Sequence, residues 1–150
     1  MIALADVAFS YPQGGFALRV PGMTVTQGAR TAIVGPSGSG KSTLLNLIAG
    51  LVVPDTGAVQ VDGTEVSTLS DAQRRAFRAT TIGFVFQNFA LMDYLSARDN
   101  ILYPYRVGLG LRLDRAARDR ADALAEACGL AGKLDRRPGG LSQGEQSGWP

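Results

Sequence analysis

The segment Gly35–Ser42 reads Gly-Pro-Ser-Gly-Ser-Gly-Lys-Ser and fits the phosphate-binding loop pattern G-x-x-x-x-G-K-[ST]. Its glycines let the backbone bend into a concave nest whose N–H groups point toward phosphate oxygens, at the start of a helix whose dipole favours negative charge. In this pattern Lys41 brings a positive charge to the outer phosphates, and Ser42 offers a hydroxyl to Mg²⁺. The segment therefore predicts binding of a nucleoside triphosphate with Mg²⁺.

The residues on both sides of the loop support this prediction. Thr31–Val34 is a short β-branched run that suits a buried strand, and Ser42–Ala49 has helical character with Gly50 available to end the helix. A glycine- and serine-rich linker is the alternative, but a linker gives no reason for a lysine–serine pair at this register between two apolar elements. The predicted nucleotide-binding residues of the loop are Gly35, Pro36, Ser37, Gly38, Ser39, Gly40, Lys41, Ser42 and Thr43.

The composition is that of a globular protein without nucleic-acid partners. A chain of 150 residues can form one core, and 45% hydrophobic and 19% charged residues are ordinary for such a domain. The net charge is only +2 and the basic residues are dispersed, which gives no support for nucleic-acid binding. The longest apolar stretch, Leu44–Val53, contains Asn46 and Gly50 and stops at Pro54, short of the ~20 residues that a membrane span needs. The N-terminus shows no signal-peptide pattern.

Turn residues divide the first part of the chain into strands. Ile2–Tyr11 and Phe16–Val25 are strand-like runs joined by residues 12–15, a pattern typical of a β-hairpin. Ala58–Val61 has the character of a further strand, between a turn at Pro54–Gly57 and a tight turn at Asp62-Gly63.

Helix signals become frequent further along the chain. Ser70–Gln73 resembles a capping box that opens a helix to about Arg78, and Thr81–Phe86 is predicted to form one more strand. Ser96 and Asp114 are predicted N-caps of two later helices.

The single cysteine, Cys128, excludes an internal disulfide. It falls on an apolar stripe of the second of these later helices, which is expected to stop at Gly129. The stripe consists of Ala117, Ala121, Leu124, Ala125 and Cys128. We therefore predict that Cys128 packs in the core.

Four landmarks, in this order, resemble those of ABC-transporter ATPases. Tyr11 resembles the aromatic residue that stacks on adenine in that family, although an aromatic residue at a strand end commonly serves packing. The phosphate-binding loop is the second landmark. Gln87 closes the strand Gly83–Phe86 and resembles the Q-loop glutamine, which implies binding of Mg²⁺ or the attacking water; the alternative is a polar strand-end cap. Leu141–Gln146 reads LSQGEQ and resembles the signature motif LSGGEQ.

The signature-like segment is specific, because other phosphate-loop proteins lack it. The resemblance implies that Ser142 and the Gly144 backbone meet the γ-phosphate of ATP bound to a second copy of the chain, so that ATP holds a homodimer together. Gln143 stands where the family usually has glycine, and a side chain must fit there. A small-molecule P-loop kinase is an alternative, but it has no use for this segment.

Other segments narrow the resemblance to ATPases of the lipoprotein-release and macrolide-export type, namely Ser67–Arg78 and Ile82–Phe89. This implies an ATP-binding subunit peripheral to the cytoplasmic face of the inner (plasma) membrane, with Lys41 and Gln87 as catalytic residues. A membrane permease is expected to bind residues 88–95, whose apolar side chains suit an amphipathic partner helix. The alternative is that these side chains pack within a helical subdomain.

The resemblance implies an α/β fold of the P-loop NTPase class and ABC type. Residues 1–87 are expected to form the nucleotide-binding core with an antiparallel β subdomain, and residues 88–146 a helical subdomain that ends in the signature. The tail 147–150 matches nothing in the family. The sequence has no counterpart of the Walker B aspartate, the catalytic glutamate or the switch histidine, so we expect a C-terminal truncation that removes part of the core sheet.

Two consequences are expected from this truncation. The isolated chain should be marginally stable or prone to aggregate, because strands of the core sheet lose their neighbours. The alternative function is a nucleotide-binding remnant without ATPase activity. A frameshift is our hypothesis for the origin of the truncation. Deletion of one base from a DNA sequence that encodes Glu-Gln-Gln-Arg-Val-Ala can yield the observed ending Glu-Gln-Ser-Gly-Trp-Pro.

Overall fold

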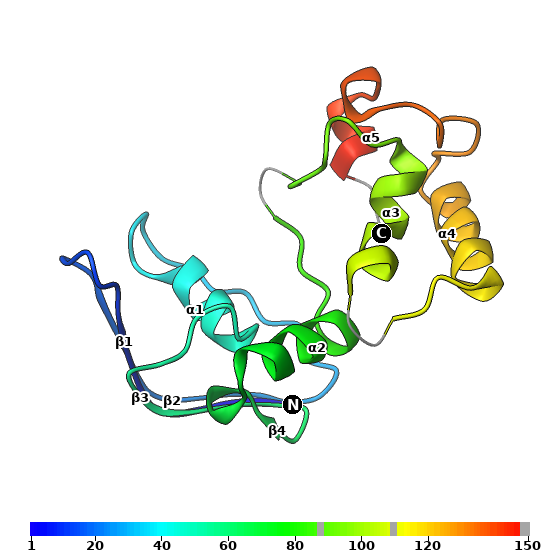
Figure 1. Cartoon of the computed structure of the whole chain (residues 1–150). Helices are drawn as coiled ribbons and strands as arrows, with labels where there is room; N and C mark the ends of the chain where they lie inside the picture. Colours follow the sequence, from blue (N-terminus) through cyan, green and yellow to red (C-terminus); the bar gives the residue numbers. More distant parts are fainter. Residues whose placement is uncertain (87–88, 109–110, 148–150) are drawn as a thin grey trace. The chain divides into compact units, whose positions relative to one another are not determined.

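The computed structural model describes residues 1–86, 89–108 and 111–147, which form two units, Met1–Arg78 and Ala79–Pro150. All the described strands belong to the first unit, and the second is made of helices and loops (Figure 1). The strand-rich unit is the one that contains the phosphate-binding loop.

The first unit is built on a four-stranded antiparallel sheet with the order β2-β1-β3-β4. β1 (Ile2–Ser10) and β2 (Ala17–Val25) form the predicted hairpin. β3 (Thr56–Val61) pairs with the other edge of β1, and β4 (Thr64–Glu65) follows it after the tight turn at Asp62-Gly63. Both turn residues have positive φ, as a two-residue hairpin requires. The predicted hairpin and the predicted strand at 58–61 are confirmed.

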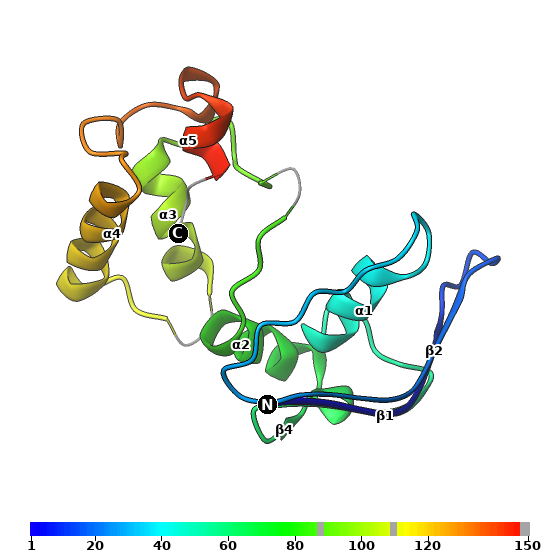
Figure 2. The ribbon, with the colours of Figure 1, turned by 180° about the vertical axis from the view of Figure 1, so that it is seen from behind.

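A β-bulge in β1 explains the glycine near the start of β3. The register between the two strands shifts between Ala5 and Ala8, and Asp6 adopts a φ of 48°. Gly57 has a φ of +87°, and a Cβ atom there would lie 2.4 Å from the carbonyl oxygen of Asp6. Only glycine fits this place, and the bulge increases the bend of the strand. Figures 1 and 2 both show a strongly curved sheet with α1 on its concave side.

α1 (Lys41–Ile48) closes the core of the first unit. It starts at Gly40, whose φ of +92° turns the loop into the helix, and Gly50 ends it as predicted, with a φ of +63°. The one-turn helix η1 (Val66–Thr68) covers the same core. The buried apolar side chains are Leu4, Val7, Phe9, Leu44, Leu47, Ile48, Val59, Val61 and Val66. Burying a side chain of this kind contributes about 1.5–3 kcal/mol each, so they anchor α1 to the sheet.

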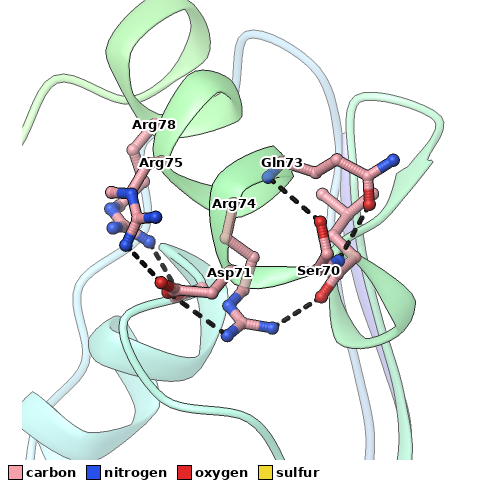
Figure 3. A network of polar contacts seen from close by, with 8 residues as sticks. Ser70, Asp71, Gln73, Arg74, Arg75 and Arg78 are labelled. Carbon is pink, nitrogen blue, oxygen red and sulfur yellow. Dashed lines mark hydrogen bonds and ion pairs between the residues drawn. The ribbon is translucent and has the colours of Figure 1, made fainter. Parts of the chain in front are cut away.

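α2 (Asp71–Thr81) opens with the predicted capping box, which the structure confirms (Figure 3). The Ser70 amide donates to Gln73 Oε1 at 2.9 Å, and the Gln73 amide donates to Ser70 Oγ at 3.3 Å. Further along the helix, Arg78 Nη1 donates to the carbonyl oxygen of Gly50 at 2.7 Å. The far end of the phosphate-loop helix is therefore capped by a side chain of α2.

The second unit contains α3 (Ala97–Val107), α4 (Arg115–Ala127), η2 (Pro138–Gly140) and α5 (Gln143–Ser147) (Figure 2). α3 packs on α4, and an ion pair between Arg98 and Asp122 joins the two helices. The buried apolar residues of this unit are Ala97, Leu102, Ala117, Ala121, Ala125, Leu130 and Leu141.

Two helices of this unit start at the predicted N-caps. The Ser96 hydroxyl accepts from the Asp99 amide at 3.1 Å, and Asp114 Oδ1 accepts from the Ala117 amide at 2.9 Å. Both N-caps are confirmed. α4 also ends just before Gly129, which has a φ of +72°.

Two of the predicted strands are wrong. Thr31–Val34 has no regular structure, Thr81 ends α2, and residues 82–86 are irregular. Val34 is 91% exposed and Val85 is 79% exposed. An apolar extended run becomes a strand only when a neighbouring strand supplies backbone partners, and no described segment pairs with either run.

The prediction of a buried Cys128 is also wrong. α4 ends at Ala127, so Cys128 forms the C-cap and its side chain is exposed. Of the predicted stripe, Leu124 is likewise 41% exposed, whereas the alanines are buried. Leu130, just past the glycine turn, is fully buried instead of Cys128.

Candidate nucleotide-binding site

The phosphate-binding loop is bent by its glycines. The Ser39 amide donates to the carbonyl oxygen of Pro36 at 3.3 Å, and Gly38 has a φ of +80°. Gly40 has a φ of +92°, and a Cβ atom there would lie 2.7 Å from the Phe16 ring, which would have to shift. The bend brings the loop to the start of α1, where the first N–H groups of the helix have no partner within it.

Lys41 lies across this loop. Its Nζ donates to the carbonyl oxygens of Gly35 at 2.9 Å and Pro36 at 2.7 Å. Among the residues that the structure describes, no carboxylate pairs with this ammonium group. A cation without a counter-ion beside the N-terminus of a helix fits a phosphate chain. Ser42, in the first turn of α1, is exposed.

The next hydroxyl has a different role. Thr43 is only 6% exposed, and its Oγ1 lies 3.3 Å from the Tyr11 hydroxyl. This hydrogen bond ties the end of β1 to the first turn of α1. Of the hydroxyls of Ser42 and Thr43, only that of Ser42 is therefore accessible.

Tyr11 is held beside the loop by aromatic contacts. Its ring packs edge-on against Phe9 with centroids 4.8 Å apart, and lies 6.1 Å from the ring of Phe16. The side chain still exposes 38% of its surface. The structure therefore brings the predicted aromatic residue, the loop and α1 together in one unit.

Asp55 is a residue of this site that the sequence reasoning missed. One oxygen, Oδ2, accepts hydrogen bonds from the Ser10 amide at 2.8 Å and the Ser10 hydroxyl at 2.9 Å, and the Asp55 amide donates to the Ala8 carbonyl at 2.8 Å. These bonds fix the chain directly before Tyr11. The only signal was an aspartate in a proline turn, which is typical of turns in general.

Gln87 lies outside the described residues, so its predicted position is not part of this geometry. The signature-like residues Ser142 and Gly144 lie in the second unit, at the start of α5, and both are exposed. The Ser142 amide donates to Glu145 Oε2 at 2.7 Å, and the Glu145 amide donates to Ser142 Oγ at 3.3 Å. This is a second capping box, which the sequence reasoning did not identify although Ser-x-x-Glu is its usual pattern.

Glu145 is also held by Lys133, whose Nζ donates to Glu145 Oε1 at 2.5 Å. This contact and the bond from the Ser142 amide lower the pKa of the carboxyl from 4.5 to about 2. Glu145 is therefore ionised at any pH near neutrality.

A groove of about 360 Å³ lies beside the predicted partner-binding segment, within the second unit. Its apolar lining includes Phe84, Phe86, Leu91, Met92, Ile101 and Pro104. Asn100 fixes the loop at its rim, because Oδ1 accepts from the Met92 amide at 2.8 Å and Nδ2 donates to the Met92 carbonyl at 3.1 Å.

Comparison with known sequences gives consistent matches. The sequence model of a family described as "ABC transporter" matches residues 18–148. A macrolide export ATP-binding/permease protein, MacB of Syntrophobacter fumaroxidans, is 40% identical over 97% of the chain, which covers 21% of that protein. A lipoprotein-releasing system ATP-binding protein, LolD 1 of Rhodopirellula baltica, is 38% identical over 97% of the chain, which covers 64% of that protein. An uncharacterised ABC transporter ATP-binding protein of Mycobacterium tuberculosis is 36% identical, with 44% of its length covered.

Solved structures give the same picture. A post-hydrolysis dimer of the ATP-binding cassette MJ0796, bound to ADP and Pi, superposes with a TM-score of 0.83 at 32% identity, over 97% of this chain and 65% of that one. A second dimeric structure of MJ0796, titled as a bacterial ABC transporter cassette, gives a TM-score of 0.82 at 34% identity. The chain thus spans about two thirds or less of the proteins that it matches. In the described part, every helix is too short or too polar to cross a membrane.

Proposed function

This chain belongs to the ABC transporter family, and we propose that it is the ATP-binding part of a transporter that drives export or lipoprotein release through a membrane permease. The observation that carries the proposal is Lys41, a cation without a carboxylate partner among the described residues, held across a glycine-bent loop at the start of α1. The names of the relatives, a macrolide exporter and a lipoprotein-releasing system, support this transporter type.

The loop residues 35–43 would hold the phosphates of ATP. Lys41 would leave its two carbonyl partners and neutralise the β- and γ-phosphates, and the free N–H groups of the loop and of α1 would donate to phosphate oxygens. Ser42 would offer its exposed hydroxyl to Mg²⁺. Mg²⁺ held there would offset the negative charge of the outer phosphates.

Tyr11 would stack on adenine with the part of its ring that remains exposed. Its hydroxyl forms a hydrogen bond with Thr43, and its ring packs against Phe9. The ring is therefore already fixed in place, and binding of the base would cost little side-chain entropy.

Hydrolysis is assigned to the whole protein, with Lys41 and Gln87 acting on phosphate, metal and water. We also propose functional boundaries at residues 1–87 for the core, 88–146 for the helical subdomain and 147–150 for the tail.

A second copy of the chain is the proposed partner for catalysis. Ser142 and the Gly144 backbone would meet the γ-phosphate of ATP that is bound to the other copy. The dimeric assembly of the MJ0796 cassette supports such a pair.

The permease is the other proposed partner, at residues 88–95. The groove lined by Phe86, Leu91 and Met92 offers an apolar surface to an amphipathic helix of the permease. The chain would then lie against the cytoplasmic face of the inner membrane as a peripheral subunit.

Titration calorimetry with ATP and Mg²⁺ tests the proposal. Lys41→Ala is expected to abolish binding, because the outer phosphates lose their cation. The matched control is Arg30→Ala, which removes an equal charge from an exposed position shortly before the loop. Unchanged affinity in Lys41→Ala would refute the assignment, and equal losses in both variants would point to general charge attraction instead.

A further inference from the structure

A network of three residues joins the signature-like segment to the loop after α4. Lys133, from the loop after α4, donates to one carboxylate oxygen of Glu145, and the other oxygen of that carboxylate accepts from the Ser142 amide. Both charged side chains are partly buried, with 34% of Lys133 and 26% of Glu145 exposed. Among the described residues, Lys133 is the charged group that acts on Glu145.

The capping box decides which atoms of Ser142 remain available. Its amide hydrogen is taken by Glu145 Oε2, and a lone pair of its hydroxyl oxygen is taken by the Glu145 amide. The Ser142 hydroxyl also helps to lower the pKa of Glu145, so its hydrogen faces that carboxylate and would have to rotate to be donated to a phosphate oxygen. The same arrangement places the Glu145 carboxylate next to the residue that is to meet a phosphate.

An ionised carboxylate at this place opposes the approach of another anion. Two like charges several ångströms apart repel measurably near a protein surface, where solvent screens them only in part. Lys133 stands against Glu145 and cancels this charge.

We propose that Lys133 is a positioning residue of the signature segment, which holds Glu145 in the cap over Ser142 and neutralises it so that the phosphates of ATP on a second copy can approach the Ser142 hydroxyl. This inference rests on the proposed function, in which Ser142 meets the γ-phosphate of a partner's ATP.

A purely structural role for Lys133 is a weaker explanation. The loop before α5 is already attached to the helix through Gln146, whose Nε2 donates to the carbonyl oxygens of Pro138 at 2.8 Å and Leu141 at 3.1 Å. These bonds involve no charge, and they remain when Lys133 is replaced. The uncharged bonds of Gln146 would therefore suffice to attach the loop to α5. The positive charge of Lys133, by contrast, reduces the negative potential beside Ser142.

The first test measures ATP-dependent self-association of the purified chain by sedimentation velocity. Lys133→Met should weaken association by about threefold to tenfold, more at low salt, because Glu145 is left unpaired. Lys133→Arg should retain it. Glu145→Gln added to Lys133→Met should restore it, since glutamine completes the same capping box without a charge. Equal weakening in Lys133→Met and in the double variant would overturn the proposal.

The second test is independent of the dimer and follows the Ser142 amide signal by NMR during an acid titration. In the unmodified chain the signal should stay constant from about pH 6 to pH 4, and in Lys133→Met it should move in this window as Glu145 takes up a proton. An unmoved signal in Lys133→Met would refute the Lys133–Glu145 assignment. The two tests can also disagree. If the Ser142 signal is constant in the unmodified chain and moves in Lys133→Met, but the unmodified chain does not associate in the presence of ATP, the proposed dimer is refuted. The neutralising role of Lys133 at the phosphate is then refuted as well.

Discussion

Replacing Gly57 with alanine should disrupt the junction between β1 and β3. The new methyl group would lie 2.4 Å from the carbonyl oxygen of Asp6 and 2.5 Å from that of Ala5. Both atoms belong to the backbone, so the strand itself must move by about 1 Å to restore ordinary contact, which typically costs 1–3 kcal/mol. The φ of +87° adds about 1–2 kcal/mol for a residue that carries a Cβ. The expected loss is about 2–5 kcal/mol of unfolding free energy.

Gly63→Ala is the matched control for this change. Gly63 has a φ of +78° in the turn between β3 and β4, and a Cβ there meets no atom within 4 Å. This variant should lose only the conformational part, about 1–2 kcal/mol. Urea unfolding, followed by circular dichroism, gives the unfolding free energy of both variants, provided that the free energy depends on urea concentration with the same slope in each. Equal losses would refute the claim that close backbone approach at the bulge requires glycine.

Three further predictions concern single side chains. Arg78→Met should lower the free energy of unfolding in urea by about 1–3 kcal/mol, because the buried Gly50 carbonyl loses its hydrogen-bond donor. Arg75→Met, on the exposed face of α2, should change this free energy by no more than about 0.5 kcal/mol. Tyr11→Leu should weaken ATP binding about tenfold in calorimetry and Tyr11→Phe should not, if the ring stacks on the base. The pKa of Glu145 is lowered from 4.5 to about 2, so the unfolded chain binds more protons between these pH values and stability rises with pH there; Glu145→Gln should flatten this part of an acid-unfolding profile.

Local signals in the sequence were sufficient for the starts of α2, α3 and α4. The capping box at Ser70 and the N-caps at Ser96 and Asp114 depend on side chains only a few residues from the backbone groups that they bind. The hairpin of β1 and β2 was predictable for the same reason, since a short turn joins its strands.

Interactions between distant segments were not predictable in this way. Thr31–Val34 has the composition of a strand, but strand formation depends on a partner that no described segment provides. The bond from Arg78 to Gly50 joins residues 28 positions apart, and that from Ser10 to Asp55 spans 45. Arginine on a helix face and aspartate in a turn are common, so neither pattern indicates these partners.

The candidate site shows the same division. The loop pattern identifies Lys41 and Ser42 because the spacing of its residues follows from phosphate geometry. It does not indicate that Thr43 is buried and bonded to Tyr11, or that Lys133 binds the Glu145 carboxylate that caps Ser142. Those relations depend on how the elements pack.

We expect the glycine-bent loop to bind the phosphates of ATP, and the chemical shifts of its amides report this binding residue by residue. Titration of the isotope-labelled chain with ATP and Mg²⁺ should move the amide signals of Gly38, Gly40, Lys41 and Ser42 most strongly, since these N–H groups lie in the loop and at the start of α1. Saturable shifts at these residues would support the account. Shifts elsewhere with an unchanged loop, or no shifts at millimolar ATP, would contradict it.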